Sequence, residues 1–175
     1  MSVGRKPRKL GETDLWEFAV RALSGRAHSA GELRQKLLRK AEHAEDVDRA
    51  IARAKELGYL NDARFAESFA SARLSNQGLG KRKVLRDLRG RRIAPETAGR
   101  AVEQAYAEAD EVQLIESFIR RKYRSHTEPL FQDRKELASA YRKLLYAGFS
   151  PGNSIKVLKR FAENPELLDD IEQPE

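Results

Sequence analysis

Hydrophobic residues recur along this chain at intervals of three and four positions, the spacing that gathers side chains on one face of an α-helix. The first such stripe consists of Leu15, Phe18, Ala19 and Leu23. Similar stripes follow through most of the chain, and β-branched residues are scarce, as expected where helix is favoured over strand. We therefore predict an all-α fold.

The helical stripes form a repeat. A shift of 51 residues superposes Phe18 on Phe69 and Leu37 on Leu88, and a shift of 56 residues superposes Leu88 on Leu144. Each copy contains three apolar stripes, which predicts three helices per copy. Because about 50 residues bury little surface alone, we expect the copies to stack into an elongated solenoid, curved or straight.

The predicted organisation has five parts. A basic N-terminal tail (1–9) precedes three helical repeats (10–61, 62–109 and 110–162), of which the second is the most basic. Residues 163–175 hold six acids, two prolines and no base, and we expect them to form a mobile acidic tail.

Helix start signals agree with this division. Ser29 followed by Glu32 is a capping-box pattern, and Asn61 or Asp62 can cap the helix that continues through Phe65. Pro151 after Ser150 suits the first position of a helix.

Composition narrows the functional class. The chain has 34 Lys and Arg against 27 Asp and Glu, a formal charge of +7, which favours polyanionic partners. It has no cysteine, which excludes disulfides and thiolate chemistry and suits a reducing compartment. No apolar stretch resembles a signal peptide or approaches the roughly 20 residues of a membrane span, so we expect a cytoplasmic protein.

The sequence offers little support for a catalytic or metal site. His28, His43 and His126 lack the spacing of helical zinc ligands, and we interpret them as loop or surface residues. The segment from Gly78 to Lys81 lacks the flanking residues of a phosphate-binding loop, and its glycines favour a tight turn. We predict no enzyme activity, no metal and no cofactor.

Positive charge is concentrated between Lys81 and Arg92, where seven bases accompany one acid, Asp87. On a helix, Arg82, Arg86 and Arg89 lie opposite the apolar face and point outward. The first repeat has Gly31, Gln35 and Leu38 at the matching positions, so the repeat fold itself does not require bases there. This contrast favours a partner surface over a merely solvated helix face.

A second basic cluster lies at the end of the third repeat's first helix. Together the predicted contact residues are Lys81, Arg82, Lys83, Arg86, Arg89, Arg91, Arg92, Arg120, Arg121, Lys122 and Arg124. We expect phosphate-directed contacts that do not read base sequence. Phe69, Phe118 and Tyr123 fall on core positions of the repeat, so we assign them to packing and expect no exposed stacking aromatics.

Three segments carry a resemblance to a known family. They are Ser29-x-x-Glu32-Leu33 with Lys36-Leu37, then Leu57-Gly58-Tyr59-Leu60-Asn61-Asp62 leading into Arg64-Phe65-Ala66, and finally Gly80 before Val84, Leu88 and Ile93. With these segments, over roughly residues 15–161, the chain resembles the RecX family of bacterial regulators of the RecA recombinase. Three tandem three-helix repeats are the architecture that the resemblance implies.

The resemblance also implies a function. A RecX-like protein is a non-enzymatic modulator that binds the RecA filament on single-stranded DNA and inhibits ATP hydrolysis, strand exchange and co-protease activity, with roles in DNA repair, recombination and the SOS response. It implies a cofactor-free monomer with weak, phosphate-directed DNA binding. The alternative is a general DNA-binding or architectural protein that recognises the phosphate backbone independently of RecA.

One position departs from the family pattern. Family members often place Gly before the apolar residue that follows the second helix, as Gly148 precedes Phe149, but the second repeat has Arg92 before Ile93. Either Gly90 ends that helix sooner or Arg92 is presented outward as an additional contact.

Overall fold

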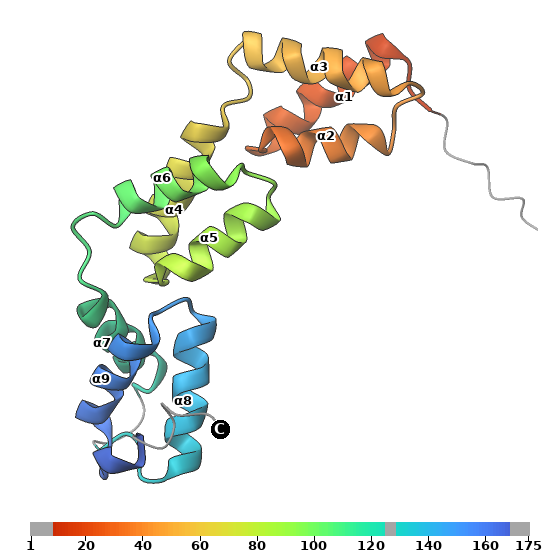
Figure 1. Cartoon of the computed structure of the whole chain (residues 1–175). Helices are drawn as coiled ribbons and strands as arrows, with labels where there is room; N and C mark the ends of the chain where they lie inside the picture. Colours follow the sequence, from red (N-terminus) through yellow and green to blue (C-terminus); the bar gives the residue numbers. More distant parts are fainter. Residues whose placement is uncertain (1–8, 125–128, 169–175) are drawn as a thin grey trace, which may run out of the picture. The chain divides into compact units, whose positions relative to one another are not determined.

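A computed structural model describes residues 9–124 and 129–168 (Figure 1). Within these ranges the regular structure is helical, with only two isolated β-bridges, Leu10 to Ala41 and Phe131 to Ala162. The α-helices are α1 (Glu12–Gly25), α2 (Ala30–Leu38), α3 (Ala44–Glu56), α4 (Asp62–Gln77), α5 (Lys81–Gly90), α6 (Pro95–Ala105), α7 (Glu111–Lys122), α8 (Arg134–Tyr146) and α9 (Pro151–Phe161). The predicted all-α fold of three-helix repeats is confirmed.

The described helices belong to two compact units. One comprises the chain up to Ala66 together with Leu88–Ala98, and the other comprises Glu67–Asp87 together with the chain from Gly99 onward. The division therefore passes through α4, α5 and α6, the helices of the second repeat. The stacking of all three repeats into a solenoid stays a prediction.

Each unit has its own apolar core. In the first unit, α1, α2 and α3 bury a cluster that includes Leu15, Leu33, Leu37 and Val47. In the second unit, α7, α8 and α9 bury the larger cluster, which includes Ile115, Phe131, Leu144, Phe149 and Leu158. The stripes seen in the sequence are thus the buried faces of these helices.

Local start signals form as the sequence predicts. Ser29 and Glu32 make a complete capping box at α2, and the Asn61 side chain accepts a hydrogen bond from the backbone N–H of Arg64 at 2.9 Å. Pro151 occupies the first turn of α9. These signals are contained within a few residues, so tertiary packing does not override them.

In the first unit, the start of α2 lies directly against the turn that follows α5. The Ser29 hydroxyl donates a hydrogen bond to the Arg91 carbonyl, and the Arg91 guanidinium pairs with Glu32 at 3.0 Å. Gly31 packs so closely on Arg92 that an added Cβ would overlap the Arg92 side chain. The capping box of α2 is therefore also a tertiary contact.

The second unit repeats this contact one repeat later. The backbone N–H of Gly80 donates to the Ala147 carbonyl at 2.9 Å, and that of Arg82 donates to the Gly148 carbonyl at 3.2 Å. A Cβ on either Gly80 or Gly148 would overlap backbone atoms of the other segment. The start of α5 thus lies against the turn after α8. In the same way, the start of α2 lies against the turn after α5.

The same left-handed turn follows α5 and α8, although only one has glycine. Gly148 has φ 93° and Arg92 has φ 61°. In both turns, the backbone N–H of the residue after the left-handed one donates to the carbonyl five positions earlier. Ile93 donates to Leu88 at 3.1 Å, and Phe149 donates to Leu144 at 3.2 Å. Helix α5 does end at Gly90, but Arg92 itself adopts the left-handed conformation, at a cost of roughly 1–2 kcal/mol.

The folded chain extends beyond the boundary predicted for the acidic tail. Residues Pro165–Leu168 form a short 3-10 helix, and Leu168 is fully buried against the core of the second unit. The backbone N–H of Glu163 also donates to the Phe131 carbonyl at 2.9 Å. The expectation of mobility therefore does not hold for residues 163–168, because Leu168 supplies an apolar anchor, while residues 169–175 lie outside the described residues.

The close contact at Gly31 generates a stability prediction. Gly31→Ala should lower the free energy of unfolding by about 1–3 kcal/mol, because the new methyl group must displace Arg92. Gly99→Ala is the matched control, since Gly99 is also helical but has open space around its Cβ position, and it should raise stability by about 0.5–1 kcal/mol. Urea unfolding measures both, and equal effects of the two substitutions would contradict the close packing.

Candidate functional site

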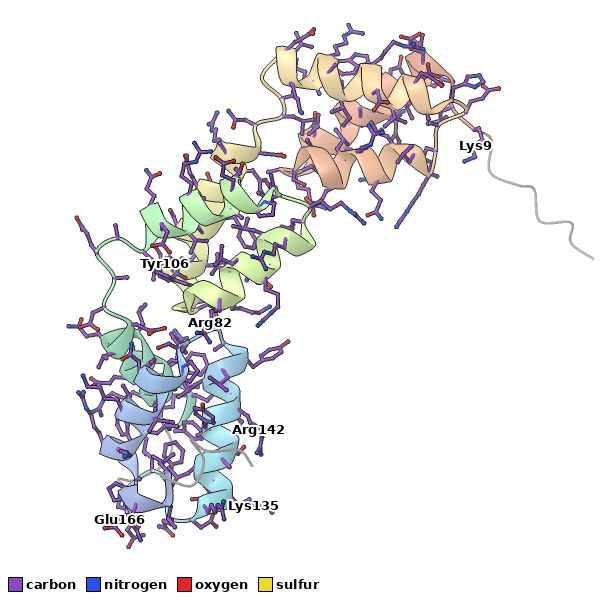
Figure 2. All side chains as sticks on the ribbon, in the orientation of Figure 1. Lys9, Arg82, Tyr106, Lys135, Arg142 and Glu166 are labelled. Carbon is purple, nitrogen blue, oxygen red and sulfur yellow. The ribbon has the colours of Figure 1, made fainter. Side chains whose placement is uncertain are left out.

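Helix α5 presents the predicted basic face to solvent. Val84 and Leu88 are fully buried, whereas Arg82, Arg86 and Arg89 are exposed, at the i, i+4 and i+7 positions of the helix. Figure 2 shows Arg82 at the end of α5 that lies next to α7 and α8. The geometry expected for these three arginines is therefore present.

The distribution of charge along α5 opposes helix stability. The first turn contains Lys81, Arg82 and Lys83 and no acid, although the positive end of the helix dipole lies there and favours negative charge. The helix dipole therefore does not account for these bases, although Lys83 forms an ion pair with Asp87 one turn later in the helix. This observation strengthens the interpretation of α5 as a partner surface.

Acidic neighbours neutralise some of the α5 bases. The ammonium group of Lys81 lies 2.9 Å from Glu103, and that of Lys83 lies 2.5 Å from Asp87. Among the described residues, Arg86 and Arg89 have no carboxylate within ion-pair distance. Arg82 also forms no ion pair with a described residue, but the charge of Glu111 lies nearby, so Arg86 and Arg89 are the α5 side chains whose charge is most available to a polyanion.

Arg91 and Arg92 have contacts of their own within the first unit. Arg91 is half-buried and pairs with Glu32, and its guanidinium also lies 5.9 Å from the centre of the Phe65 ring. Arg92 is exposed, and its Nε donates to the Gln35 side chain at 3.3 Å. Both arginines hold the turn after α5 against α2, a structural role that the sequence analysis did not foresee.

The predicted cluster at the end of α7 is exposed and has different surroundings. Arg120, Arg121, Lys122 and Arg124 are all exposed. Arg121 donates to the Gln77 carbonyl at 2.7 Å and so caps the C-terminal end of α4, while Arg120 lies over the Phe161 ring. A single surface that joins this cluster to α5 stays a prediction.

The loop before α5 is held by an aromatic hydroxyl. The Tyr106 hydroxyl donates to the Leu79 carbonyl at 2.6 Å, and burial raises the pKa of Tyr106 to about 12. Gly78 has φ 56°, which confirms that this glycine segment makes a tight turn. The turn and the Tyr106 contact place the first bases of α5.

Glu111 organises the start of α9 beside this loop. Its carboxylate accepts the Ser150 backbone N–H at 2.9 Å, the Ser150 hydroxyl at 2.5 Å and the Asn153 amide at 2.6 Å. Burial opposes ionisation, but these hydrogen bonds and the nearby Arg82 charge outweigh it, so the pKa of Glu111 lies below its ordinary value. Glu111 and Arg82 border a cavity of about 440 Å³, to which we assign no ligand, because its lining carboxylates Glu103 and Glu111 already bind Lys81 and Ser150.

Two of the three histidines, His28 and His43, lie within the described residues. As predicted, His28 lies in a loop, the one between α1 and α2, but it is buried, and neither ring nitrogen has a hydrogen-bond partner among the described residues. Burial and the charges of Arg26 and Lys36 lower the pKa of His28. His43 is exposed, and His126 lies outside the described residues. Within the part of the chain that the structure describes, no three His, Cys, Asp or Glu side chains form a metal-binding group.

Aromatic side chains are placed mostly as predicted. Phe118 and Tyr123 pack against the core of the second unit, and Phe69 is half-buried beneath Arg73. Two tyrosines are exceptions among the described residues: Tyr59 is 56% exposed, and Tyr146 is 72% exposed at the end of α8. The Tyr146 carbonyl accepts a hydrogen bond from Arg86 at 3.0 Å, so an exposed aromatic ring does accompany the basic face.

Within the described residues, tandem three-helix groups and one helix with an exposed basic face, α5, define a helical-repeat protein. Residues 16–53 match the first three-helix domain of RecX, and residues 61–102 match the second. No helix of the described residues is long and apolar enough to cross a membrane.

Individual relatives agree with this match. The chain is 30% identical to "Regulatory protein RecX" of Trichlorobacter lovleyi over 71% of this chain and 80% of the relative. It is 32% identical to the protein of that name from Escherichia coli strain SE11, over 85% and 92% of the two chains. The crystal structure of RecX from Lactobacillus salivarius has the same fold, with a TM-score of 0.64 at 19% identity over 86% and 96% of the two chains. The chain belongs to the RecX family of regulatory proteins.

The Glu111 network generates a pH-dependent prediction. A carboxyl group whose pKa is lowered by folding stabilises the fold when ionised, and this contribution disappears as the pH falls through the lowered pKa. Glu111→Gln should therefore cost about 1–2 kcal/mol at pH 7 and less at an acidic pH below the ordinary value of 4.5, because the contribution of the ionised carboxylate is lost as the pH falls toward its lowered pKa.

Urea unfolding at the two pH values measures this difference. Glu108→Gln is the control, because Glu108 is exposed and has no hydrogen bond or ion pair among the described residues. A cost of Glu111→Gln that is the same at both pH values would contradict a role for the ionised carboxylate.

Proposed function

We propose that this chain binds the RecA filament on single-stranded DNA and inhibits its ATP hydrolysis, strand exchange and co-protease activity. Membership in the RecX family carries the proposal, because the match covers most of the length of both relatives described above. The protein would act without a cofactor, as a cytoplasmic monomer, in DNA repair, recombination and the SOS response.

The basic face of α5 supplies the contact in this proposal. Arg82, Arg86 and Arg89 are exposed, and the first-turn bases are not explained by the helix dipole. A filament offers two acidic targets, namely carboxylates on the protein and phosphates on the DNA, and exposed arginines suit both. Charge of this kind would speed association and fix the register of binding.

A second candidate function follows from the same side chains. Arg86 and Arg89 lack carboxylate partners among the described residues, which also suits a protein that binds the DNA backbone independently of RecA. The two functions differ in their dependence on recombinase. Binding to bare DNA that falls steeply with salt, without an effect on RecA, would favour the second.

The proposal predicts a charge-dependent inhibition of RecA. Added in substoichiometric amount, the wild-type protein should inhibit ATP hydrolysis by RecA on single-stranded DNA. Replacing Arg82, Arg86 and Arg89 by alanine should raise the concentration for half-inhibition by about tenfold or more, because three exposed charges are lost. Circular dichroism first establishes that the variants are folded.

A matched triple variant controls for net charge. Lys55, Arg64 and Lys135 are exposed bases on other helices, and their replacement by alanine removes the same charge. This control should inhibit RecA as the wild type does. Equal losses in both triple variants would overturn the assignment to α5, and a wild-type protein that shifts bare DNA but never affects the ATPase would overturn the RecA proposal.

A further inference from the structure

Tyr146 is the most exposed of the large hydrophobic side chains that the structure describes. It is 72% exposed, compared with 56% for Tyr59 and 52% for Leu57. The matching positions are Gly90 in the second repeat and Arg39 in the first, so the repeat fold does not require an aromatic residue there. One exposed aromatic alone needs no functional explanation, and the surroundings of the ring decide its meaning.

Two basic side chains of α5 flank the Tyr146 ring. The Lys83 ammonium lies 5.7 Å from the ring centre, and the Arg86 guanidinium carbon lies 5.9 Å from it. Both distances are within the range of a cation–π interaction. Arg86 is fixed further by its hydrogen bond to the Tyr146 carbonyl at 3.0 Å.

The location of the ring is also well defined by the fold. Tyr146 is the last residue of α8, immediately before the turn at Ala147 and Gly148 that accepts backbone hydrogen bonds from Gly80 and Arg82. That contact brings the first turns of α5 beside the ring within one compact unit. The aromatic surface and the two cations therefore form one preorganised cluster, which we call the Tyr146 cluster: Lys83, Arg86 and Tyr146.

An aromatic face beside cations matches the chemistry of a single-stranded nucleic acid. Each unpaired base offers a planar face for stacking, and each linkage offers an anionic phosphate. In a duplex, the base faces are covered by neighbouring bases, so a ring on the protein surface cannot reach them without unstacking. An acidic protein surface would use the cations but not the exposed ring.

We propose that Tyr146 stacks on an unpaired base of a single strand while Arg86, whose charge has no carboxylate partner among the described residues, contacts the adjacent phosphate. The site discriminates single from double strands by the stacking face and does not read base identity. This inference concerns the bare strand, so it stands or falls separately from the action on RecA.

Two oligonucleotides test the proposal by fluorescence anisotropy. One is a labelled oligothymidylate of about 16 nucleotides, and the other is an abasic oligonucleotide of the same length, which keeps the phosphates but offers no base to stack. Tyr146→Ala should weaken binding to oligothymidylate by about fivefold or more and leave binding to the abasic strand unchanged. Tyr146→Phe, which keeps an aromatic face, should bind both strands as the wild type does.

Two further variants separate stacking from charge and from general surface effects. Arg86→Ala should weaken binding to both strands and reduce the slope of log affinity against log salt by about 0.7, the value for one phosphate contact on a single strand. Tyr59→Ala is the matched control, because Tyr59 is an exposed tyrosine in the other unit, and it should change neither affinity.

Fluorescence gives a direct readout of stacking. The chain has one tryptophan, Trp16, so a variant with Trp16→Phe and Tyr146→Trp carries its only indole at the proposed site. Oligothymidylate should quench this fluorescence and the abasic strand should not. An oligouridylate that quenches equally also supports the proposal, and the tighter of the two probes identifies DNA or RNA as the preferred strand.

Three results would overturn the proposal. Tyr146→Ala could bind oligothymidylate as tightly as the wild type. It could lose affinity equally for both strands, which would make Tyr146 a support for Arg86 alone. It could also leave strand binding intact while abolishing inhibition of RecA, which would assign the ring to a protein contact.

Discussion

The structure depends on a close contact that occurs twice. The start of α2 packs on the turn after α5, and the start of α5 packs on the turn after α8. The contact occurs in the first unit, where Gly31 packs on Arg92, and in the second, where Gly80 packs on Gly148. At the first contact only Gly31 lacks a Cβ, whereas at the second both Gly80 and Gly148 do, because an added methyl group would overlap the other segment. The contact at Gly148 also sets where α5 begins and therefore which ring its bases meet.

Electrostatics within α5 then explains which charges are available for binding. The first turn holds three bases against the helix dipole, and Glu103 and Asp87 compensate Lys81 and Lys83. Arg86 has no such carboxylate among the described residues and instead interacts with the carbonyl and ring of Tyr146. Neutral partners leave the Arg86 charge intact, which suits a surface that must still attract phosphates or carboxylates.

Features determined by a few neighbouring residues could be predicted from the sequence, and features determined by distant contacts could not. The Ser29–Glu32 capping box and the turn at Gly78 formed as expected because their causes are local. The left-handed conformation of Arg92 and the anchoring of Leu168 depend on tertiary packing, which composition does not reveal. The exposure of Tyr146 could have been predicted, because the repeat aligns this residue with Gly90 and Arg39. Its position within a run of apolar residues instead suggested a buried side chain.

Site-specific photo-crosslinking tests whether the basic face of α5 touches the RecA filament. A benzoylphenylalanine introduced at Arg89 lies on the exposed face of α5, and one introduced at Lys55 lies exposed on α3. Irradiation with RecA, single-stranded DNA and ATP should crosslink position 89 to RecA or to the DNA and leave position 55 free. Crosslinks from position 55 with none from position 89 would contradict the claim.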